Sequence, residues 1–407
     1  MPEDIYCVEG VSLTRPFQIR RLGHFGINVA SVDAALDFYS RLLGFEISDE
    51  LDFGPRVPEA LKAQVGPTRG VFTRHGTDHH SFVLFPKRAV EACNPHYGPY
   101  PELMVNQITW QVSSLREVVD GFKWFSEKGL KILRSGRDTP GSNWHIYPAD
   151  PDGHVNELYY GIEQIGWAGM SKPLAMHGIR YLQPPELPHR SEFAEVNAAL
   201  QQGLPLDGGY RRQAASPETF DVGGVLLARP FKITKIGPVR IFVKDVHAAL
   251  NFYQKTLGLS QTEEVIYEGH RCVFLRANTE HHSLAIYPIA LRSVLDLAEN
   301  SSLFGFGVQL GSYAQLREAV AFLTQAGLQF KELPQALFPG MGHHVWLSDP
   351  DGNLVQLYWE MEQIGWDGKP RPADLRRSWN ADPAAWPTEI SSQSDSYSGE
   401  VFLGPLN

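Results

Sequence analysis

The stretch of sequence that decides the fold reads Tyr147-Pro148-Ala149-Asp150-Pro151-Asp152-Gly153-His154-Val155-Asn156-Glu157-Leu158-Tyr159. Its centre predicts a tight turn, because proline fixes φ at the second position and glycine tolerates a positive φ at the last. The ranges 144–149 and 155–160 on either side are apolar and aromatic, so we expect them to be two strands joined by this turn. The turn returns as Asp349-Pro350-Asp351-Gly352, which indicates an internal duplication.

Other motifs repeat with the same spacing. Arg15-Pro16-Phe17 returns at residues 229–231, Asp78-His79-His80-Ser81 returns with Glu280 at 280–283, and Glu163-Gln164-Ile165-Gly166-Trp167 returns at 362–366. A chain of 407 residues has room for two such domains. We expect an N-terminal domain over residues 1–167, a linker over 168–221, a C-terminal domain over 222–370 and a tail over 371–407.

Each domain divides again into two modules. In the first module, a strand at 22–29 precedes a helix at 33–43 that ends at Gly44, and further strands follow near 45–48, at 70–73 and at 81–85. In the second, a strand at 107–112 and a helix at 115–128 precede strands at 131–134, 144–149 and 155–160. The ranges 236–287 and 304–359 repeat this order, and 192–202 predicts a helix in the linker. The fold class is therefore α+β, with two tandem domains, each of two βαβββ modules that form a curved mixed sheet around a metal pocket.

The composition excludes several classes of partner. The net charge is −10 and no long run of Lys or Arg occurs, so we expect no nucleic acid and no membrane surface as partner. The three scattered cysteines, Cys7, Cys93 and Cys272, indicate reduced thiols. Without a signal peptide or a membrane span, a cytoplasmic protein is expected, and we further expect a homo-oligomer.

Three residues have the types and positions of a metal site. His24 lies in the first strand of module one, Gln107 at the equivalent place of module two, and Glu157 in the last strand. Side chains from three strands can converge inside a curved sheet, and a histidine, a carboxylate and a neutral ligand with open positions suit Fe(II) or Mn(II). In the second copy Pro238 and Gln356 stand in place of His24 and Glu157, so we expect a degenerate site there.

The range 23–29, the run His80-Ser81-Phe82-Val83-Leu84 and the stretch 147–159 together resemble the vicinal oxygen chelate superfamily. Within it, the chain is most similar to type I extradiol ring-cleavage dioxygenases, of the catechol 2,3-dioxygenase and dihydroxybiphenyl dioxygenase kind. The resemblance implies that His24 and Glu157 bind Fe(II), and that Gln107 stands where those enzymes carry a second histidine ligand. It further implies that His80 is the acid/base, that Tyr147 hydrogen-bonds the bound diol, and that Asp138 replaces a further histidine.

Other residues are candidates for the pocket wall. Substrate-binding roles are predicted for a set that combines polar side chains near the ligands with aromatic rings, namely Asp138, Asn143, His145, Trp110, Trp144 and His79. Structural alternatives stay open for several of these. His281 and His282 persist in the copy without ligands, so the His79-His80 pair can serve the fold alone. Gln107 can equally be a spectator that hydrogen-bonds a neighbour, and Asp138 a turn residue.

The leading functional hypothesis is a non-haem Fe(II) dioxygenase of the extradiol type, with its site in the N-terminal domain. Its partners are a small aromatic or otherwise oxygen-chelating substrate and O2, and Mn(II) is the alternative cofactor. Because Gln107 and Asp138 depart from the pattern of the dioxygenases, a redox-neutral metal enzyme (isomerase, C–C hydrolase or lyase) is a second hypothesis. A metal-free protein that binds small molecules is the third.

Overall fold

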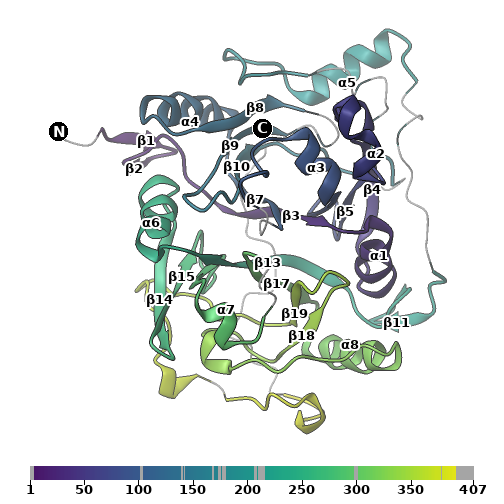
Figure 1. Cartoon of the computed structure of the whole chain (residues 1–407), viewed down its shortest axis with the longest axis vertical. Helices are drawn as coiled ribbons and strands as arrows, with labels where there is room; N and C mark the ends of the chain where they lie inside the picture. Colours follow the sequence, from purple (N-terminus) through teal and green to yellow (C-terminus); the bar gives the residue numbers. More distant parts are fainter. Residues whose placement is uncertain are drawn as a thin grey trace.

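The computed structural model describes residues 4–390 apart from 101–103, 139–140, 142, 167–168, 173–175, 177–179, 206–208, 210–215, 298–300 and 377. Over these residues the chain folds into two curled mixed sheets of eight and seven strands, one above the other (Figure 1). The predicted α+β fold of two tandem domains is confirmed. Trp167 and the end of the predicted tail, 391–407, lie outside the described residues.

The N-terminal sheet has the strand order β4-β5-β6-β3-β7-β10-β9-β8. Its strands are β3 (Arg21–Val29), β4 (Glu46–Asp52), β5 (Arg69–Arg74), β6 (Phe82–Pro86), β7 (Val105–Gln111), β8 (Ile132–Arg137), β9 (Trp144–Pro148) and β10 (Asn156–Tyr160). The two modules meet where β3 and β7 pair antiparallel at the centre of the sheet. The Asp-Pro-Asp-Gly turn joins β9 to β10, as predicted.

The two helices predicted for this domain are found, each within one residue of its expected ends. The Oγ atoms of Ser31 and Ser114 accept backbone N–H bonds at the starts of α1 (Val32–Leu36) and α4 (Leu115–Glu127). The predicted helix at 33–43 continues from α1 into a π-helical turn, η1 (Asp37–Leu42), before Gly44 ends it at φ +99°. Short helices fill the connections, namely η2 (Gly54–Arg56), η3 (Glu59–Leu61), α2 (Lys62–Val65) and α3 (Lys87–Cys93).

The C-terminal sheet repeats this order as β14-β15-β16-β13-β17-β19-β18. Its elements are β13 (Ile233–Val243), α6 (Val246–Leu250), η5 (Asn251–Thr256), β14 (Ser260–Tyr267), β15 (His270–Arg276), β16 (Leu284–Pro288), α7 (Leu291–Val294), β17 (Leu303–Leu310), α8 (Tyr313–Gln325), η6 (Gln335–Leu337), β18 (His344–Ser348) and β19 (Leu354–Tyr358). In place of a counterpart to β8, the described residues hold one isolated bridge between Lys331 and Trp346. Pro334 follows closely and cannot donate to a ladder, which limits the pairing.

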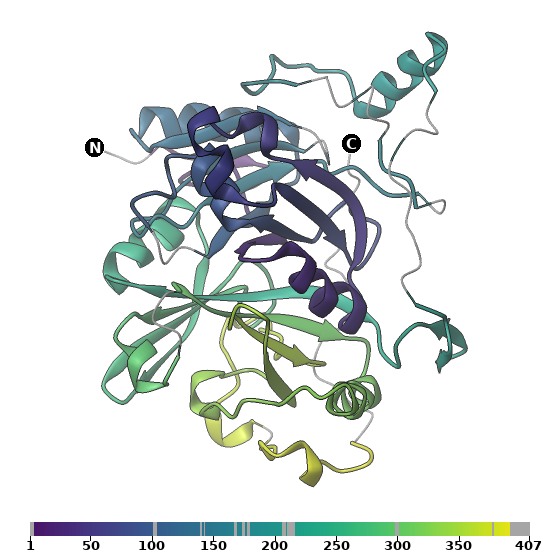
Figure 2. The ribbon, with the colours of Figure 1, turned by 45° about the vertical axis from the view of Figure 1, so that its right-hand side comes forward.

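The remaining elements lie outside the two sheets. Each domain begins with a hairpin, β1 (Tyr6–Val8) with β2 (Val11–Leu13) and β11 (Phe220–Val222) with β12 (Val225–Leu227). The predicted linker helix is α5 (Glu192–Gln201), and Figure 2 shows it standing away from the two sheets. Two turns of 3-10 helix, η7 (Ala373–Leu375) and η8 (Pro383–Ala385), follow the second sheet.

The repeated motifs make reciprocal contacts between the domains. Arg229 donates to the backbone oxygens of Ser40 and Arg41 at the end of η1, and Arg15 donates to the oxygen of Gly258 after η5. Each Arg-Pro-Phe motif therefore closes a helix of the other domain. The second Asp of each turn also makes a hydrogen bond to the other domain. Asp351 accepts from the N–H of Ala30 at 2.8 Å, and Asp152 accepts from the N–H of Lys244 at 3.1 Å.

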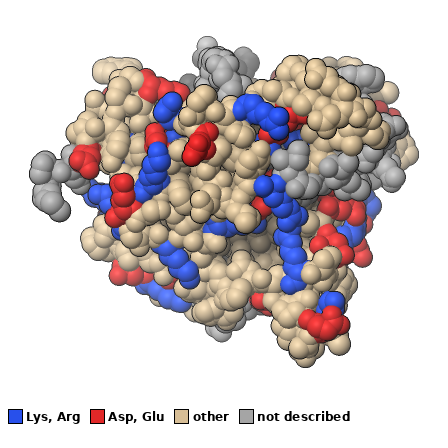
Figure 3. Space-filling model, turned by 90° about the horizontal axis from the view of Figure 1, so that it is seen from above, with Lys and Arg blue, Asp and Glu red and all other residues tan. Residues whose placement is uncertain are grey.

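The hydrophobic core is continuous through this boundary. Phe25 on β3 and Phe306 on β17 are both fully buried, and their ring centres lie 5.1 Å apart. The two domains thus form one packed body. On the face seen from above in Figure 3, acidic and basic side chains are interspersed. Within the part of the chain that the structure describes, no helix combines the length and apolar character required to span a bilayer.

Candidate metal centre

Strand register brings three side chains abreast at the centre of the N-terminal sheet. His24 on β3 pairs with Thr109 on β7, and Thr109 also pairs with Glu157 on β10. The three strands are neighbours, so the three side chains share one face of the curled sheet. His24, Thr109 and Glu157 are each fully buried.

The two predicted ligands, His24 and Glu157, face each other directly. Nε2 of His24 lies 3.1 Å from Oε2 of Glu157. Two donors bound at right angles to one ion at about 2.1 Å are about 3.0 Å apart, so this pair fits adjacent corners of an octahedral site. Among the described residues, no set of three or more His, Cys, Asp and Glu side chains gathers in a way that could hold a metal ion. The groups beside the pair on β7 are neutral.

Thr109 also belongs to this cluster, although no motif in the sequence indicates it. Its Oγ1 donates to Oε2 of Glu157 at 3.1 Å, and His24 is the residue paired with Thr109 on the neighbouring strand. The predicted ligand Gln107 pairs instead with Gly26, one step further along the same face. Gln107 and His24 occupy equivalent positions in their two modules. In the antiparallel pair of β3 and β7, however, His24 lies opposite Thr109 and not opposite Gln107. Gln107 is therefore the diagonal neighbour of His24, and the absence of a side chain at Gly26 leaves it room.

Hydrogen bonds hold the carboxylate of Glu157 from both sides. Nδ2 of Asn143 donates to Oε1 at 2.7 Å, and the hydroxyl of Tyr147 also hydrogen-bonds the carboxylate. Burial alone would raise the pKa of Glu157, but His24, His145 and Tyr147 together lower it to about 2. Glu157 is thus a buried, deprotonated carboxylate, which is the protonation state that a metal ligand requires.

The two adjacent histidines form a chain that leads to this pair. The ring of His80 lies 4.3 Å from that of His24, and its Nδ1 is 3.0 Å from Nδ1 of His79. Nε2 of His79 in turn lies 3.4 Å from Oδ2 of Asp49 on β4. Burial, followed by the charges of His24 and His79, lowers the pKa of His80 well below its ordinary value. His80 is therefore a neutral imidazole beside the predicted ligands.

A glycine permits a close approach over these histidines. Gly141 has φ +92°, and a Cβ atom built on it would lie 2.8 Å from the ring of His80. Its backbone oxygen accepts from the N–H of Glu163, so Gly141 is held against the histidine pair. In the second domain Gly340 lies as close to His281, the counterpart of His79. The repeated glycine in the sequence was the available signal for this contact.

Two further predicted residues, His145 and Asp138, lie near each other, and His145 also contacts Asn143. His145 lies with Nδ1 3.1 Å from Oδ1 of Asn143 and with Nε2 3.8 Å from Oδ2 of Asp138. Burial is the main cause that lowers the pKa of His145, to about 4. Asp138 pairs with Arg134 on β8 at 3.2 Å, and Arg134 lies 4.3 Å from the centre of the Tyr147 ring.

The two predicted tryptophans do not join this cluster. Trp110 is on the opposite face of β7 from Thr109, where its Nε1 donates to Oδ1 of Asn156 within the hydrophobic core. Trp144 is on the opposite face of β9 from His145 and packs against Tyr181. Side chains alternate along a strand, so neither ring reaches the face that holds the ligand pair.

In the C-terminal domain a buried arginine takes the corresponding space. Arg240, the counterpart of Gly26, is fully buried, and its Nη2 donates to Oε1 of Gln356 at 2.7 Å. Its guanidinium lies 5.1 Å from the centre of the Trp346 ring. Burial lowers the pKa of Arg240 to about 10. A fixed cation thus stands beside the neutral Gln356 where the other domain has an anion.

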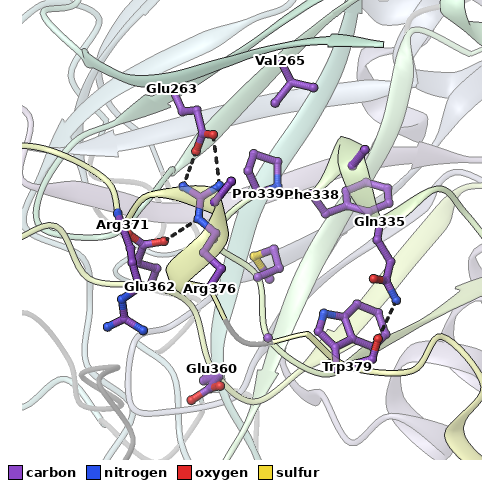
Figure 4. A pocket seen from close by; sticks show the side chains of 15 residues that line it. Glu263, Val265, Gln335, Phe338, Pro339, Glu360, Glu362, Arg371, Arg376 and Trp379 are labelled. Atoms are coloured by element: carbon purple, nitrogen blue, oxygen red, sulfur yellow. Dashed lines mark hydrogen bonds and ion pairs between the residues drawn. The ribbon is translucent and has the colours of Figure 1, made fainter. Parts of the chain in front are cut away.

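A cavity of about 380 Å³ opens beside β14 in this second domain (Figure 4). The guanidinium of Arg376 lies between the carboxylates of Glu263 and Glu362 and hydrogen-bonds both. Nε2 of His281 lies 2.9 Å from Glu263, which is the counterpart of the contact between His79 and Asp49. The histidine chain therefore persists in a domain whose ligand positions hold proline and glutamine.

Comparison with known proteins identifies the fold. Residues 21–158 and 235–357 match the model of the Glyoxalase/Bleomycin resistance protein/Dioxygenase superfamily. The chain is 26% identical over 144 residues to a 3-methylcatechol 2,3-dioxygenase of Pseudomonas putida, covering 35% of this chain and 43% of that protein. It is 28% identical over 172 residues to metapyrocatechase 2 of Cupriavidus necator, covering 42% and 46%. The matches span less than half the length of either relative.

A solved structure extends the likeness over most of the chain. The Mn(II)-bound glyoxalase of Novosphingobium aromaticivorans superposes with a TM-score of 0.52 at 15% identity, covering 86% of this chain and 85% of the glyoxalase. Identity at this level establishes the fold, and this fold carries more than one chemistry. Because the family model matches one region in each sheet and together these span more than half of the sequence, the chain belongs to the Glyoxalase/Bleomycin resistance protein/Dioxygenase superfamily.

Proposed function

We propose that the N-terminal domain is a non-haem Fe(II) dioxygenase of the extradiol type that cleaves a catechol-like aromatic ring. The observation that carries this proposal is the buried pair of His24 Nε2 and Glu157 Oε2, 3.1 Å apart, beside the neutral imidazole of His80. The names of the two sequence relatives, both proteins that act on catechols, support the substrate class. Gln107 is proposed as the third protein ligand.

The chemistry divides between the metal and the protein. Fe(II), or Mn(II) in its place, supplies the Lewis acidity and the electron transfer that ring cleavage by O2 requires. His24 and Glu157 would hold the ion, and Asn143 fixes Oε1 of Glu157 so that Oε2 lies next to Nε2 of His24. His145 orients Asn143 through its Oδ1 atom. These groups are preorganised because hydrogen bonds from two sides fix the carboxylate.

His80 is proposed as the base. Asp49 favours a proton on Nε2 of His79, so Nδ1 of His79 accepts from Nδ1–H of His80. This tautomer leaves Nε2 of His80 without a proton, free to accept one from a substrate hydroxyl. Tyr147, whose hydroxyl donates to Glu157, is proposed to hydrogen-bond the bound diol by accepting from a diol hydroxyl at its phenolic oxygen.

Metal content and oxygen uptake test the proposal. The full chain, purified without oxygen, is expected to hold about one equivalent of iron, and His24→Ala is expected to lose it. His247→Ala, an exposed histidine on α6, serves as the matched control. Addition of catechol to the iron-loaded protein should consume one O2 for each catechol. Iron binding without oxygen uptake would overturn the dioxygenase.

The neutral side chains on β7 favour a second candidate. Both Gln107 and Thr109 offer an oxygen, a harder donor than the imidazole expected in ring-cleaving relatives. Such a site suits a redox-neutral reaction on a chelated oxyanion, namely isomerisation, C–C hydrolysis or a lyase reaction. A metal-bound protein that turns over a chelating substrate without oxygen would support this candidate. A chain that binds no metal even with added Fe(II) or Mn(II) would instead be a binding protein for small molecules.

A further inference from the structure

The buried arginine of the C-terminal domain has no counterion among the described residues. Arg240 on β13 is fully buried, and its Nη2 donates to Oε1 of Gln356, a neutral amide, at 2.7 Å. Tyr287 and Tyr358 are the groups that offset the effect of burial on its pKa, and both are phenols that are neutral at ordinary pH. A buried charge is costly unless a charge of opposite sign accompanies it. The fold therefore leaves one positive charge to be balanced.

Hydrogen-bond donors without partners lie on and beside this guanidinium. Within the described part of the chain, Nε and Nη1 of Arg240 have no partner, and neither have Nε2 of Gln356 and Nε1 of Trp346. Nε2 of Gln356 belongs to the amide whose oxygen accepts from Arg240, and Trp346 is the residue paired with Gln356 on the neighbouring strand β18. All three side chains are at most 2% exposed. Proteins leave few buried donors unpaired, so these nitrogen atoms point to an acceptor that the described residues do not supply.

The duplication explains the sign of the charge. Arg240 and Gln356 stand where the N-terminal domain has Gly26 and Glu157. In the first domain a buried carboxylate is suited to a metal cation, whereas in the second a fixed cation stands beside a neutral amide. The two substitutions reverse the sign of the charge inside the curled sheet. The position that suits a cation in one domain therefore suits an anion in the other.

The surroundings of Arg240 limit the class of anion. The guanidinium carbon lies 5.1 Å from the centre of the Trp346 ring and 5.4 Å from that of Phe338, and these two rings are 4.8 Å apart. Burial, followed by the charges of His281 and Arg240, holds the pKa of His282 well below its ordinary value, so this neighbour is neutral. Arg240 thus supplies a single positive charge between packed rings, which a small anion with one negative charge matches.

We propose that the C-terminal domain binds a small monovalent anion, of the chloride class, at Nε and Nη1 of Arg240, with Nε2 of Gln356 and Nε1 of Trp346 as further donors. The anion neutralises the buried cation and gives the unpartnered N–H groups an acceptor. Because the site exists only in the folded chain, the anion stabilises the fold as its concentration rises. The inference goes beyond the proposed function, since neither iron nor a catechol takes part.

Two cavities lie next to the rings that flank Arg240. Phe338 lines the cavity of about 380 Å³ in Figure 4, together with the exposed Gln335. Trp346 lines a second cavity, of about 320 Å³, together with the exposed Asp382. A turn of either ring is the route by which a small ion reaches the guanidinium, because side chains in packed cores do exchange rotamers.

Exchange of one anion for another at constant ionic strength tests the proposal. The full chain is transferred into sodium gluconate, whose anion is too large for a site between packed rings, and sodium chloride then replaces it stepwise. We expect chloride at roughly 0.2 M to raise the Tm of the wild type by about 2 °C or more. An equal Tm in the two salts would overturn the inference.

Variants identify the residues responsible. Gln356→Glu gives Arg240 a counterion within the chain, because it restores the carboxylate that Glu157 has in the first domain. We expect this variant to lose the rise in Tm with chloride, and Arg240→Met to lose it as well. Gln261→Glu makes the same change of charge at an exposed position of β14 and should respond like the wild type. A chloride response that survives in Gln356→Glu would be a general effect of salt and would rule out the site.

Bromide locates the anion directly. Crystals of the full chain soaked in sodium bromide should show an anomalous peak in contact with Nη1 of Arg240, and Gln356→Glu should show none there. His24→Ala should keep both the peak and the chloride response whatever its iron content, so the outcome does not depend on the proposed function. Bromide at surface positions alone in the wild type would contradict the proposal.

Discussion

Tyr39 of the N-terminal domain donates a 2.8 Å hydrogen bond to Oδ2 of Asp349 in the C-terminal domain, and its counterpart Tyr253 donates one of 3.0 Å to Oδ2 of Asp150. The same aspartates hold their own turns, since Oδ1 of Asp150 accepts from two backbone N–H groups. The repeated Asp-Pro-Asp-Gly motif therefore both closes a turn and joins the domains. A duplicated chain keeps such a motif in both copies, whatever becomes of the chemistry in one of them.

Loss of either hydroxyl should weaken the boundary between the domains. Tyr39→Phe removes a donor from the buried carboxylate of Asp349, whose pKa is already raised by burial. We expect a cost of about 2 kcal/mol in the free energy of unfolding, and a similar cost for Tyr253→Phe. Chemical denaturation measures both, with Tyr6→Phe on the first hairpin as the control. A cost within error of that control would contradict the role of these bonds.

The contact of Arg15 with Gly258 predicts an asymmetric effect of alanine. A Cβ atom at Gly258 would lie 1.8 Å from the guanidinium of Arg15, and the backbone there has φ +85°. At the matching Gly44 the nearest atom of Arg229 is 3.2 Å away. We expect Gly258→Ala to cost about 1 kcal/mol more than Gly44→Ala, in addition to the strain of a positive φ common to both.

A double variant separates the clash from the strain. Arg15→Ala combined with Gly258→Ala should relieve the clash but keep the backbone strain. The double variant should therefore be more stable than the summed effects of the two single variants predict. Strict additivity of the two substitutions would show that the arginine moves aside at no cost.

Much of the fold follows from local signals in the sequence. The turn at Asp150 and the glycines after the helices are chemistry within a few residues, and the strands and helices predicted for the N-terminal domain are found. The pairing of His24 with Thr109 could not be predicted, because a register shift between Leu22 and His24 in the β3–β7 pair decides which residue lies opposite. Register depends on the packing of the entire sheet.

Contacts between residues far apart in the sequence could not be predicted either. The burial of Arg240 depends on Gln356 and Trp346, which are more than 100 residues away in the sequence. The repeated Asp-Pro-Asp-Gly motif predicts a turn, but the tyrosines that donate to its first aspartate lie in the other domain. The residue type of Trp110 predicts a place at the site, whereas strand alternation places it in the core.

Arg240 provides a test of the degenerate site. Arg240→Met removes a buried cation but leaves Oε1 of Gln356 without its donor. We expect this single variant to cost about 2 kcal/mol, and the double variant with Gln356→Leu to recover most of that loss, because a matched apolar pair needs no hydrogen bonds. Arg116→Met is the surface control. A double variant less stable than the single one would mean that the cation itself stabilises the domain.

The ion pairs of Glu263 predict a dependence of stability on pH. Burial alone would raise its pKa, but His281 and Arg376 lower it from an ordinary value of 4.5 to about 2. A carboxyl whose pKa is lower in the folded state stabilises the fold above its unfolded pKa, and this contribution is lost as the pH falls from about 4.5 towards about 2.

Glu263→Gln isolates that contribution. Above about pH 5 the wild type should be the more stable of the two, and the difference in unfolding free energy should shrink steadily between pH 4.5 and pH 3. Denaturant titrations at several pH values measure it, with Glu264→Gln, at the neighbouring exposed carboxylate of β14, as the control. A difference that stays constant over this range would contradict the lowered pKa.

Substitutions on β7 can decide which neutral oxygen binds the metal. Gln107 and Thr109 share one face of the strand, but Thr109 already donates its hydroxyl proton to Glu157. We therefore expect Gln107→Ala to weaken iron binding by roughly tenfold or more, and Thr109→Val to change it by less than about threefold. Gln107→His, which restores an imidazole, should bind iron at least as tightly as the wild type. Iron affinity measured without oxygen by competition with a chelator gives all three values, and the reverse order of the first two would assign the ligand to Thr109.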